Sequence, residues 1–408
     1  MTPTKPSDKS ILVQKYGGVC LATPEKIKRA AEHVRSLVDQ GNRLVVVVSA
    51  MGPTTDELTK LAHEVSHHPN QRELDMLLTA GERISMSLMS MALTDLGLSS
   101  ISFTGSQAGV MTDHSYSNAR IMDVRPIRVE EELSKNKVVV LAGFQGVNPE
   151  SKEITTLGRG GTDTTAVAMA AKLKAKRCEI IKEVSGVCSS DPKMIPEAQG
   201  IERLSYEALS DICFWGAKVL QYRCVELAQR TQVPVVIKRW EDFQIATEVV
   251  HQLRSDSMET SEVISINSHA EVDHLEIDCA HLNEGFNVFK THLSQFKISY
   301  PQILASNFDN GKIRLMVTGD ALTLQSLRKS LEEELKIRSL GETQSTVTVT
   351  CSGLYRSEKI FDLIHMLHEN GVKAHKILSQ ALSVTFGVPQ AHRETAIKVL
   401  HSLVGRKL

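Results

Sequence analysis

The 408-residue sequence lacks the usual marks of a disulfide-linked, zinc-binding or membrane-spanning protein. It has no Cys-x-x-Cys pair, and its seven cysteines are scattered and odd in number, which favours reduced thiols in a cytosolic protein. The most hydrophobic run, "LVVVVSAM", is far too short to cross a bilayer. Only ten residues, mostly polar, precede the first apolar segment, too few for a signal or transit sequence. We therefore expect a cytoplasmic protein without a membrane partner.

The sequence also lacks an excess of charge of either sign. Its 47 Lys and Arg residues balance 48 Asp and Glu residues, for a formal net charge of -1, which argues against wholesale binding to nucleic acid. Apolar residues make up 41% of the chain, enough for a large core, and the length predicts two or three domains.

Apolar runs alternate with helical patterns up to about residue 250. A helix is expected from Thr23, a capping residue followed by Pro24, until Gly41, and the strand "RLVVVVSAM" follows at once. Similar runs recur at "KVVVLAGF", "CEIIKEV" and "VPVVIK". Because these runs are apolar on both faces, they predict an α/β domain around a covered, mostly parallel sheet.

The pattern changes after the polar stretch "SDSMETSEVISINSHAE". Two similar units follow, each with the order strand, helix, strand, strand, helix, which is typical of small ferredoxin-like modules. Such modules could hold subunits together or bind an effector, and the pattern alone leaves both interpretations open.

Two glycine turns at helix starts indicate an anion site. In "QKYGGVC", Lys15 ends a buried strand and precedes Gly17 and Gly18, whose backbone N–H groups could face a phosphate. In "TTLGRGGTDTTAVAMAAKL", Gly158, Gly160 and Gly161 form a second turn. Either turn alone could be an ordinary tight turn, but together they predict a polyanion between them.

The second turn also carries charged side chains. Arg159 could grip a carboxylate through two hydrogen bonds, and Asp163 could orient Lys15 or share a metal. We expect Thr162 to cap a helix that begins near Asp163. Taken separately, a solvated arginine and a simple cap are the common alternatives.

A series of motifs resembles that of the aspartokinases, in order and at the expected intervals. They include "QKYGGVC", "VVVVSAMGPTTDELTKLA", "ELDMLLTAGERISMSLMSMAL", "GFQGVNPESKEITTLGRGGTDTTAVAMAAKLKAKRCEI" and "GAKVLQYRCVELAQRTQVPVVI". The resemblance covers essentially the whole chain. It implies a three-layer αβα sandwich of the amino-acid-kinase type over residues 10–250, followed by ACT modules over residues 263–345 and 346–408.

The resemblance also implies an activity: ATP-dependent phosphorylation of the β-carboxylate of L-aspartate, the first step towards lysine, threonine and methionine. Lys15 and Asp163 would be the catalytic residues, and Mg²⁺ would bridge the nucleotide phosphates. The aspartate pocket would comprise Ser49, Thr55, Glu82 at the α-ammonium and Arg159 at the α-carboxylate. The ATP site would comprise Lys15, Gly17, Gly18, Glu183, Asp191, Lys193 and Lys218. Taken alone, Glu82 could equally lie on the solvated face of its helix, and Lys218 could cap a turn.

Several positions depart from the family pattern. Val19 and Cys20 stand where threonine and serine usually follow the glycines, and "KEVSGVC" replaces a Thr-Asp-Val-Asp-Gly-Val-Tyr run. The usual His-Pro after "GAKVL" is Gln221-Tyr222, a change expected to affect packing more than chemistry. Lys373-Ala374 cannot copy an asparagine that helps lysine-sensitive members bind their effector, so feedback by threonine, or by no amino acid, is expected instead.

Two classes of function remain open at this point. The chain is either a working aspartokinase, expected as a homodimer or higher homo-oligomer, or a catalytically weak relative with a regulatory or scaffolding role. Kinases of glutamate or acetylglutamate are a distant third alternative, because they lack the two-module tail.

Overall fold

The computed structural model describes residues 10–67, 69–251, 261–295, 301–319, 321–331, 337–353 and 357–406. The chain divides into two compact units. The first unit comprises Met1–Cys188, Gly200–Cys213 and Lys218–Arg254, and the second comprises Ser189–Gln199, Phe214–Ala217 and Ser255–Leu408.

A mostly parallel sheet forms the centre of the first unit. Its strands are β1 (Ile11–Tyr16), β2 (Arg43–Val48), β3 (Ser100–Phe103), β6 (Val138–Ala142), β9 (Arg177–Lys182), β10 (Arg203–Ser205), β11 (Val235–Arg239) and β12 (Ile245–Val250). Their order is β10-β12-β11-β9-β1-β2-β6-β3, and the antiparallel pairing of β11 with β12 is the exception to parallel pairing. The predicted α/β fold is confirmed.

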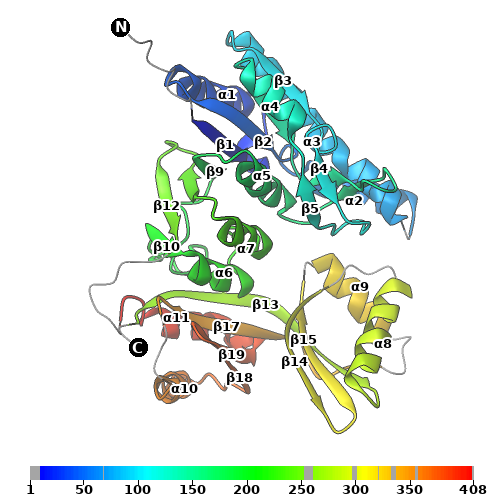
Figure 1. The fold of residues 1–408 in the computed structure, drawn as a ribbon. Coiled ribbons are helices and arrows are strands. Elements are labelled where there is room, and N and C mark those ends of the chain that lie inside the picture. The colour runs from blue at the N-terminus through cyan, green and yellow to red at the C-terminus, as the bar shows by residue number, and fades with distance from the viewer. Residues whose placement is uncertain are drawn as a thin grey trace. The chain divides into compact units, whose positions relative to one another are not determined.

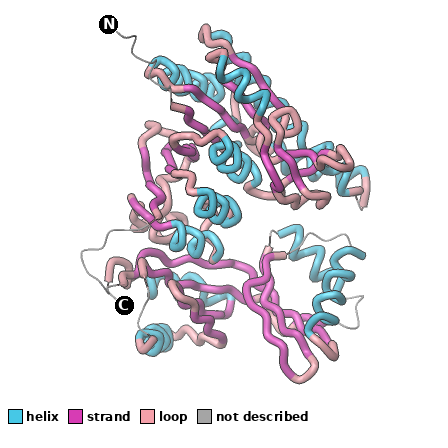
Figure 2. Tube along the Cα trace, in the orientation of Figure 1, coloured by secondary structure: helices cyan, strands magenta, loops and turns pink. Residues whose placement is uncertain are grey.

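Helices cover both faces of this sheet, as Figures 1 and 2 show. The helices and the 3₁₀ turn of the unit are η1 (Gly18–Leu21), α1 (Pro24–Asp39), α2 (Thr54–Val65), α3 (Gln71–Asp95), α4 (Ile127–Ser134), α5 (Gly161–Lys172), α6 (Tyr206–Phe214) and α7 (Tyr222–Thr231). Side chains of α1 and α3 share a core with one face of β1, β2 and β6. On the other face, α5 packs against β1 and α7 packs against α5. The first unit is therefore a three-layer αβα sandwich.

The first helix begins where its sequence predicts. The hydroxyl of Thr23 accepts a hydrogen bond from the backbone N–H of Lys26 at 3.3 Å, and Pro24 occupies the first turn. The short strands β4 (Val110–Thr112), β5 (Ile121–Val124), β7 (Gln145–Val147) and β8 (Ile154–Thr156) form a second sheet, which the sequence did not predict.

The second unit confirms the predicted repeat of strand, helix, strand, strand and helix. The first repeat has β13 (Val263–Asp278), α8 (Leu282–Gln295), β14 (Gln302–Asp309), β15 (Lys312–Thr318) and α9 (Ala321–Leu331), followed by the short β16 (Ile337–Ser339). The second has β17 (Gln344–Cys351), α10 (Lys359–Glu369), β18 (Lys376–Ser379), β19 (Ser383–Pro389), the 3₁₀ turn η2 (Gln390–His392) and α11 (Arg393–His401). All described strands of the second unit join one sheet, because β13 pairs with β17 along its first half and with β15 along its second half.

Two segments that interrupt the first unit in the sequence belong to the second unit. Ile195, from the segment 189–199, is buried in the apolar core around β17 and β19. Trp215, from the segment 214–217, is buried with Val272 and Met316. The domain limits expected from the sequence remain a prediction.

Candidate active site

Lys15 is the buried cation at the centre of the candidate site. Its side chain is only 7% exposed, and its Nζ lies 2.7 Å from Oδ1 of Asp163. Lys15 comes from the end of β1, and Asp163 comes from the first turn of α5. A buried charge is costly unless it is paired, so each residue needs the other or a ligand. The expectation that Asp163 orients Lys15 agrees with this contact.

A second lysine, which the sequence reasoning missed, contacts the same carboxylate. Lys182 is the last residue of β9, and its Nζ lies 3.3 Å from Oδ2 of Asp163. The ammonium of Lys182 also donates a hydrogen bond to the backbone oxygen of Val219. Burial alone would raise the pKa of Asp163, but the ammonium groups of Lys15 and Lys182 hold it below its usual value. The carboxylate therefore stays ionised.

The first glycine pair serves two different purposes. A Cβ on Gly17 would lie 3.7 Å from Nζ of Lys15, so the absent side chain leaves space beside that ammonium. A Cβ on Gly18 would lie 2.8 Å from the backbone oxygen of Ala50, and the oxygen of Gly18 accepts a hydrogen bond from the N–H of Gly52 at 2.9 Å. Gly17 fits the predicted anion site, whereas Gly18 is needed for the close approach of two loops.

The second glycine turn starts its helix earlier than predicted. Gly158 and Gly160 have φ angles of +75° and +72°, in the left-handed region that favours glycine. Gly160 is the N-cap, and α5 begins at Gly161. The prediction that Thr162 caps this helix is therefore wrong. The reversal at Gly160 places Thr162 inside the first turn, where it is buried.

Arg159 extends from this turn into solvent. Its side chain is 69% exposed, and its Nη2 lies 3.4 Å from Oδ1 of Asp56, next to Thr55 in the first turn of α2. Its backbone oxygen accepts a hydrogen bond from the side chain of Gln221. An exposed ion pair contributes little stability, so a carboxylate ligand could displace Asp56 at small cost. Gln221 supports the turn through this bond, which agrees with the expected effect on packing.

Glu82 is buried, contrary to the simpler interpretation of its helix. The residue is 3% exposed, and its Oε1 accepts a hydrogen bond from the N–H of Ala50 at 3.1 Å. Within the part of the chain that the structure describes, its Oε2 has no hydrogen-bond partner. Burial raises the pKa of Glu82 to about 7, although the Ala50 amide and Lys15 oppose this. One buried carboxylate oxygen of Glu82 is thus left without a partner among the described residues.

Ser49 and Thr55 lie on the loop and helix next to Glu82. The N–H of Ser49 donates to the oxygen of Tyr16 at 3.2 Å, and its oxygen accepts from the hydroxyl of Ser85 at 2.6 Å. These bonds fix Ser49 between the end of β1 and α3. Thr55 is the second residue of α2.

Among the described residues, the remaining predicted ATP residues have their contacts away from the Lys15–Asp163 pair. Glu183 is exposed and pairs with Lys26, and Lys218 is exposed on the loop before α7. Asp191 and Lys193 belong to the second unit, where Oδ1 of Asp191 accepts a hydrogen bond from the N–H of Lys193 at 2.9 Å. Their roles stay predictions.

Cys20 and Val19, which depart from the family pattern, have opposite environments. Val19 is exposed, whereas Cys20 is buried, and burial raises the pKa of its thiol to about 11. Cys20 is therefore a neutral thiol near pH 7.

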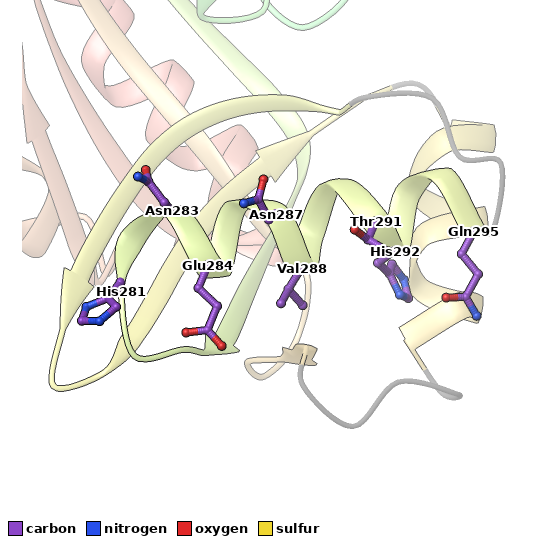
Figure 3. Close-up of a pocket in the computed structure, with 8 residues that line it drawn as sticks. All are labelled: His281, Asn283, Glu284, Asn287, Val288, Thr291, His292 and Gln295. Atoms are coloured by element: carbon purple, nitrogen blue, oxygen red, sulfur yellow. The ribbon is translucent and has the colours of Figure 1, made fainter.

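A separate pocket lies beside α8 in the second unit. Figure 3 shows the side chains of Asn283 and Asn287 leaving the helix on one side, and those of Glu284 and Val288 on another. No residue predicted for aspartate or ATP lines it.

Within the described ranges, no group of three or more His, Cys, Asp or Glu side chains could hold a metal ion. No helix in these ranges is both long and apolar enough to cross a membrane.

Comparisons with known sequences identify the family of the chain. Residues 10–239 match the model of the amino acid kinase family. The chain is 49% identical to the aspartokinase of Mycobacterium tuberculosis over 250 residues, 61% of this chain and 59% of the relative. The chain thus spans well under two thirds of that relative's length. It is 33% identical to the aspartokinase of Bacillus sp. (strain MGA3) over 402 residues, 96% of each chain.

Solved structures show the same fold. Aspartokinase III of E. coli, in complex with aspartate and ADP, matches with a TM-score of 0.76 over 97% of this chain and all of that one, at 21% identity. The aspartate kinase of Synechocystis matches with a TM-score of 0.55 at 31% identity, over 97% of this chain and 69% of that one. With the buried Lys15–Asp163 pair, the two glycine turns and these matches, the chain belongs to the amino acid kinase family and, within it, to the aspartokinases.

Proposed function

We propose that the protein is an aspartate kinase that transfers the γ-phosphoryl group of ATP to the β-carboxylate of L-aspartate, the step that leads towards lysine, threonine and methionine. The observation that carries this proposal is the buried Lys15–Asp163 ion pair beside Gly17, together with a buried oxygen of Glu82 that has no hydrogen-bond partner among the described residues. Together these groups offer positive charge to a phosphoryl group and negative charge to an amino group.

In the proposed reaction, an oxygen of the β-carboxylate attacks the γ-phosphorus, the bond from that phosphorus to the β,γ-bridging oxygen breaks, and ADP leaves. The protein need not form a covalent intermediate, because positioning and neutralisation of charge provide most of the catalysis in such transfers. Lys15 would neutralise charge on the transferred group, and Asp163 would hold the Lys15 ammonium in place.

L-Aspartate would be held at both ends of its backbone. We infer that Oε2 of Glu82 accepts a hydrogen bond from the α-ammonium and that Arg159 exchanges Asp56 for the α-carboxylate. Ser49 and Thr55 would line the same pocket.

ATP would bind with Mg²⁺ on its phosphates. The described residues include no cluster of three potential ligands, and both oxygens of Asp163 face ammonium groups. This setting fits a Mg²⁺ ion that would be held mainly by the phosphates and would keep several waters. The backbone of Gly17 and Gly18 would also meet the phosphates, whereas Glu183, Asp191, Lys193 and Lys218 are proposed for the nucleotide by resemblance alone.

The family resemblance also implies partners for the protein. We propose a homo-oligomer whose ACT modules bind threonine or no amino-acid effector. E. coli aspartokinase III has been crystallised with lysine and aspartate, but Lys373 and Ala374 of this chain argue against a lysine site of that kind. Cys20, Cys178, Cys213, Cys224 and Cys279 are free thiols, which supports a cytoplasmic location.

A hydroxamate assay tests the proposed activity. Purified protein with ATP, Mg²⁺ and hydroxylamine should form a hydroxamate from L-aspartate, and much less from L-glutamate or N-acetylglutamate. A rate no higher than the no-enzyme control with any of the three acids, from folded protein, would instead support a regulatory or scaffolding role.

A further inference from the structure

Lys182 adds a second positive charge to the Lys15–Asp163 pair. Two ammonium groups, of Lys15 and Lys182, contact the single carboxylate of Asp163. The net charge of this trio is +1, and Asp163 and Lys15 are almost completely buried. Burying a net charge costs free energy unless a counter-charge arrives, so the trio is suited to an anion.

The pairing of the strands directs both lysines to the same face of the sheet. Lys15 of β1 pairs with Ile180 of β9, so these two side chains share a face. Lys182 lies two residues beyond Ile180 and therefore faces the same side, one strand away. This is the face covered by α5, and the two glycine turns lie at the same carboxyl edge of the sheet.

Lys182 also contacts the loop that carries Lys218. The Lys182 ammonium reaches the backbone oxygen of Val219, the neighbour of Lys218, while the side chain of Lys218 is exposed. Lys182 is 20% exposed, so it is accessible to a ligand while it contacts Asp163. In the family run that resembles "KEVSGVC", threonine stands at this position, so the cation is a feature of this chain.

We propose that Lys182 is a second phosphate-binding cation, which with Lys15 contacts the phosphate oxygens of the nucleotide, while Asp163 positions both ammonium groups. The identity of the anion as ATP rests on the proposed function. The alternative is that Lys182 only ties the end of β9 to α5 and to the loop at Val219. If Lys182 has only this structural role, its replacement should weaken the binding of all ligands equally. If it contacts phosphates, its replacement should weaken only ligands that carry phosphates.

The test compares four full-length proteins: wild type, Lys182→Gln, Lys182→Arg and the control Lys172→Gln. Lys172 lies at the far end of α5, where it pairs with Asp123. Calorimetry gives the dissociation constant of MgATP, and competition gives that of adenosine. We expect Lys182→Gln to weaken MgATP at least tenfold and adenosine less than twofold. Lys182→Arg should keep most of the MgATP affinity, and the control should match wild type.

Equal affinity of Lys182→Gln and wild type for MgATP, or parallel losses for MgATP and adenosine, would overturn the proposal. A measurement on wild type covers the case in which the variant does not fold. ATP, but not adenosine, should protect Lys182 from acetylation as followed by mass spectrometry, and unprotected labelling would also overturn the proposal.

These experiments distinguish a failure of the Lys182 proposal from a failure of the proposed function. Wild type that binds MgATP through Lys182 but forms no aspartyl hydroxamate contradicts the aspartate kinase assignment alone. Hydroxamate formation with unchanged MgATP affinity in Lys182→Gln contradicts the role of Lys182 alone.

Discussion

At the scale of single residues, burial and nearby charges change the pKa values of side chains in the first unit. Glu82 is the clearest case, because its pKa of about 7 lies far above the ordinary value of 4.5. Its charge is therefore set by pH in the neutral range, where an unperturbed glutamate would be fully ionised. A residue in this state can respond to a cationic ligand by losing its proton.

This response predicts a pH dependence of aspartate binding. The raised pKa means that Glu82 in the free protein is protonated below about pH 7 and ionised above it. If the ionised form binds the α-ammonium, affinity should rise with pH, by about tenfold per pH unit at most, and level off above pH 7. Calorimetry from pH 5.5 to 8.5 measures this.

Glu82→Gln is the control for that experiment. It should bind aspartate weakly and without the rise below pH 7. An identical pH profile in Glu82→Gln and wild type would show that another group is responsible.

A substitution of Arg159 should affect aspartate and ATP differently. Arg159→Lys should replace a two-bond grip on the α-carboxylate with a single contact, and the KM for aspartate should rise roughly 10-fold to 100-fold. The dissociation constant of ATP, measured without aspartate, should hardly change. If ATP binding weakens instead, Arg159 belongs to the nucleotide site.

At the scale of elements, the loop from β1 to α1 combines a ligand site with a tight loop crossing. Gly17 has a φ of −71°, which alanine adopts readily, and its Cβ would make only ordinary contact. Gly18 has no such room, because its Cβ would press on the backbone of Ala50. We therefore expect alanine substitutions of these two neighbouring glycines to have different effects.

Gly18→Ala should destabilise the fold by about 1–3 kcal/mol, because a backbone must move to admit the methyl group. Gly17→Ala should leave the free energy of unfolding within about 0.5 kcal/mol of wild type. It should nevertheless lower ATP turnover, because its methyl group occupies the space beside Lys15. Denaturant melts and hydroxamate rates on both variants measure these effects. A Gly17→Ala protein with full turnover would show that this space is not used by a phosphate.

Long regular elements were predictable from the sequence, whereas side-chain environments were less so. The cap at Thr23 gave the start of α1, because capping is a local interaction. In α3, however, apolar side chains such as Ile84 and Met91 are exposed, so the pattern did not identify the buried face that holds Glu82. The helix α5 starts early because the φ of Gly160 depends on its surroundings.

At the scale of the whole molecule, the order of elements was readable but their pairing was not. Lys182 lies in a predicted strand, yet its place beside Lys15 depends on the register of β9 against β1, which no local pattern encodes. Strands such as β4 and β7 have three residues each, too few for a recognisable alternation. The packing of Ile195 and Trp215 within the second unit likewise depends on contacts distant in sequence.

The measurement that tests the central claim most directly is the ATP-dependent rate of aspartyl hydroxamate formation by wild type and by Lys15→Ala. Removing the ammonium at the transferred group should lower the rate by about 10²-fold or more, while circular dichroism shows an intact fold. Wild type should form aspartyl hydroxamate well above the no-enzyme control. A folded Lys15→Ala protein with nearly the rate of wild type would contradict the account, because catalysis would then not use the Lys15–Asp163 site.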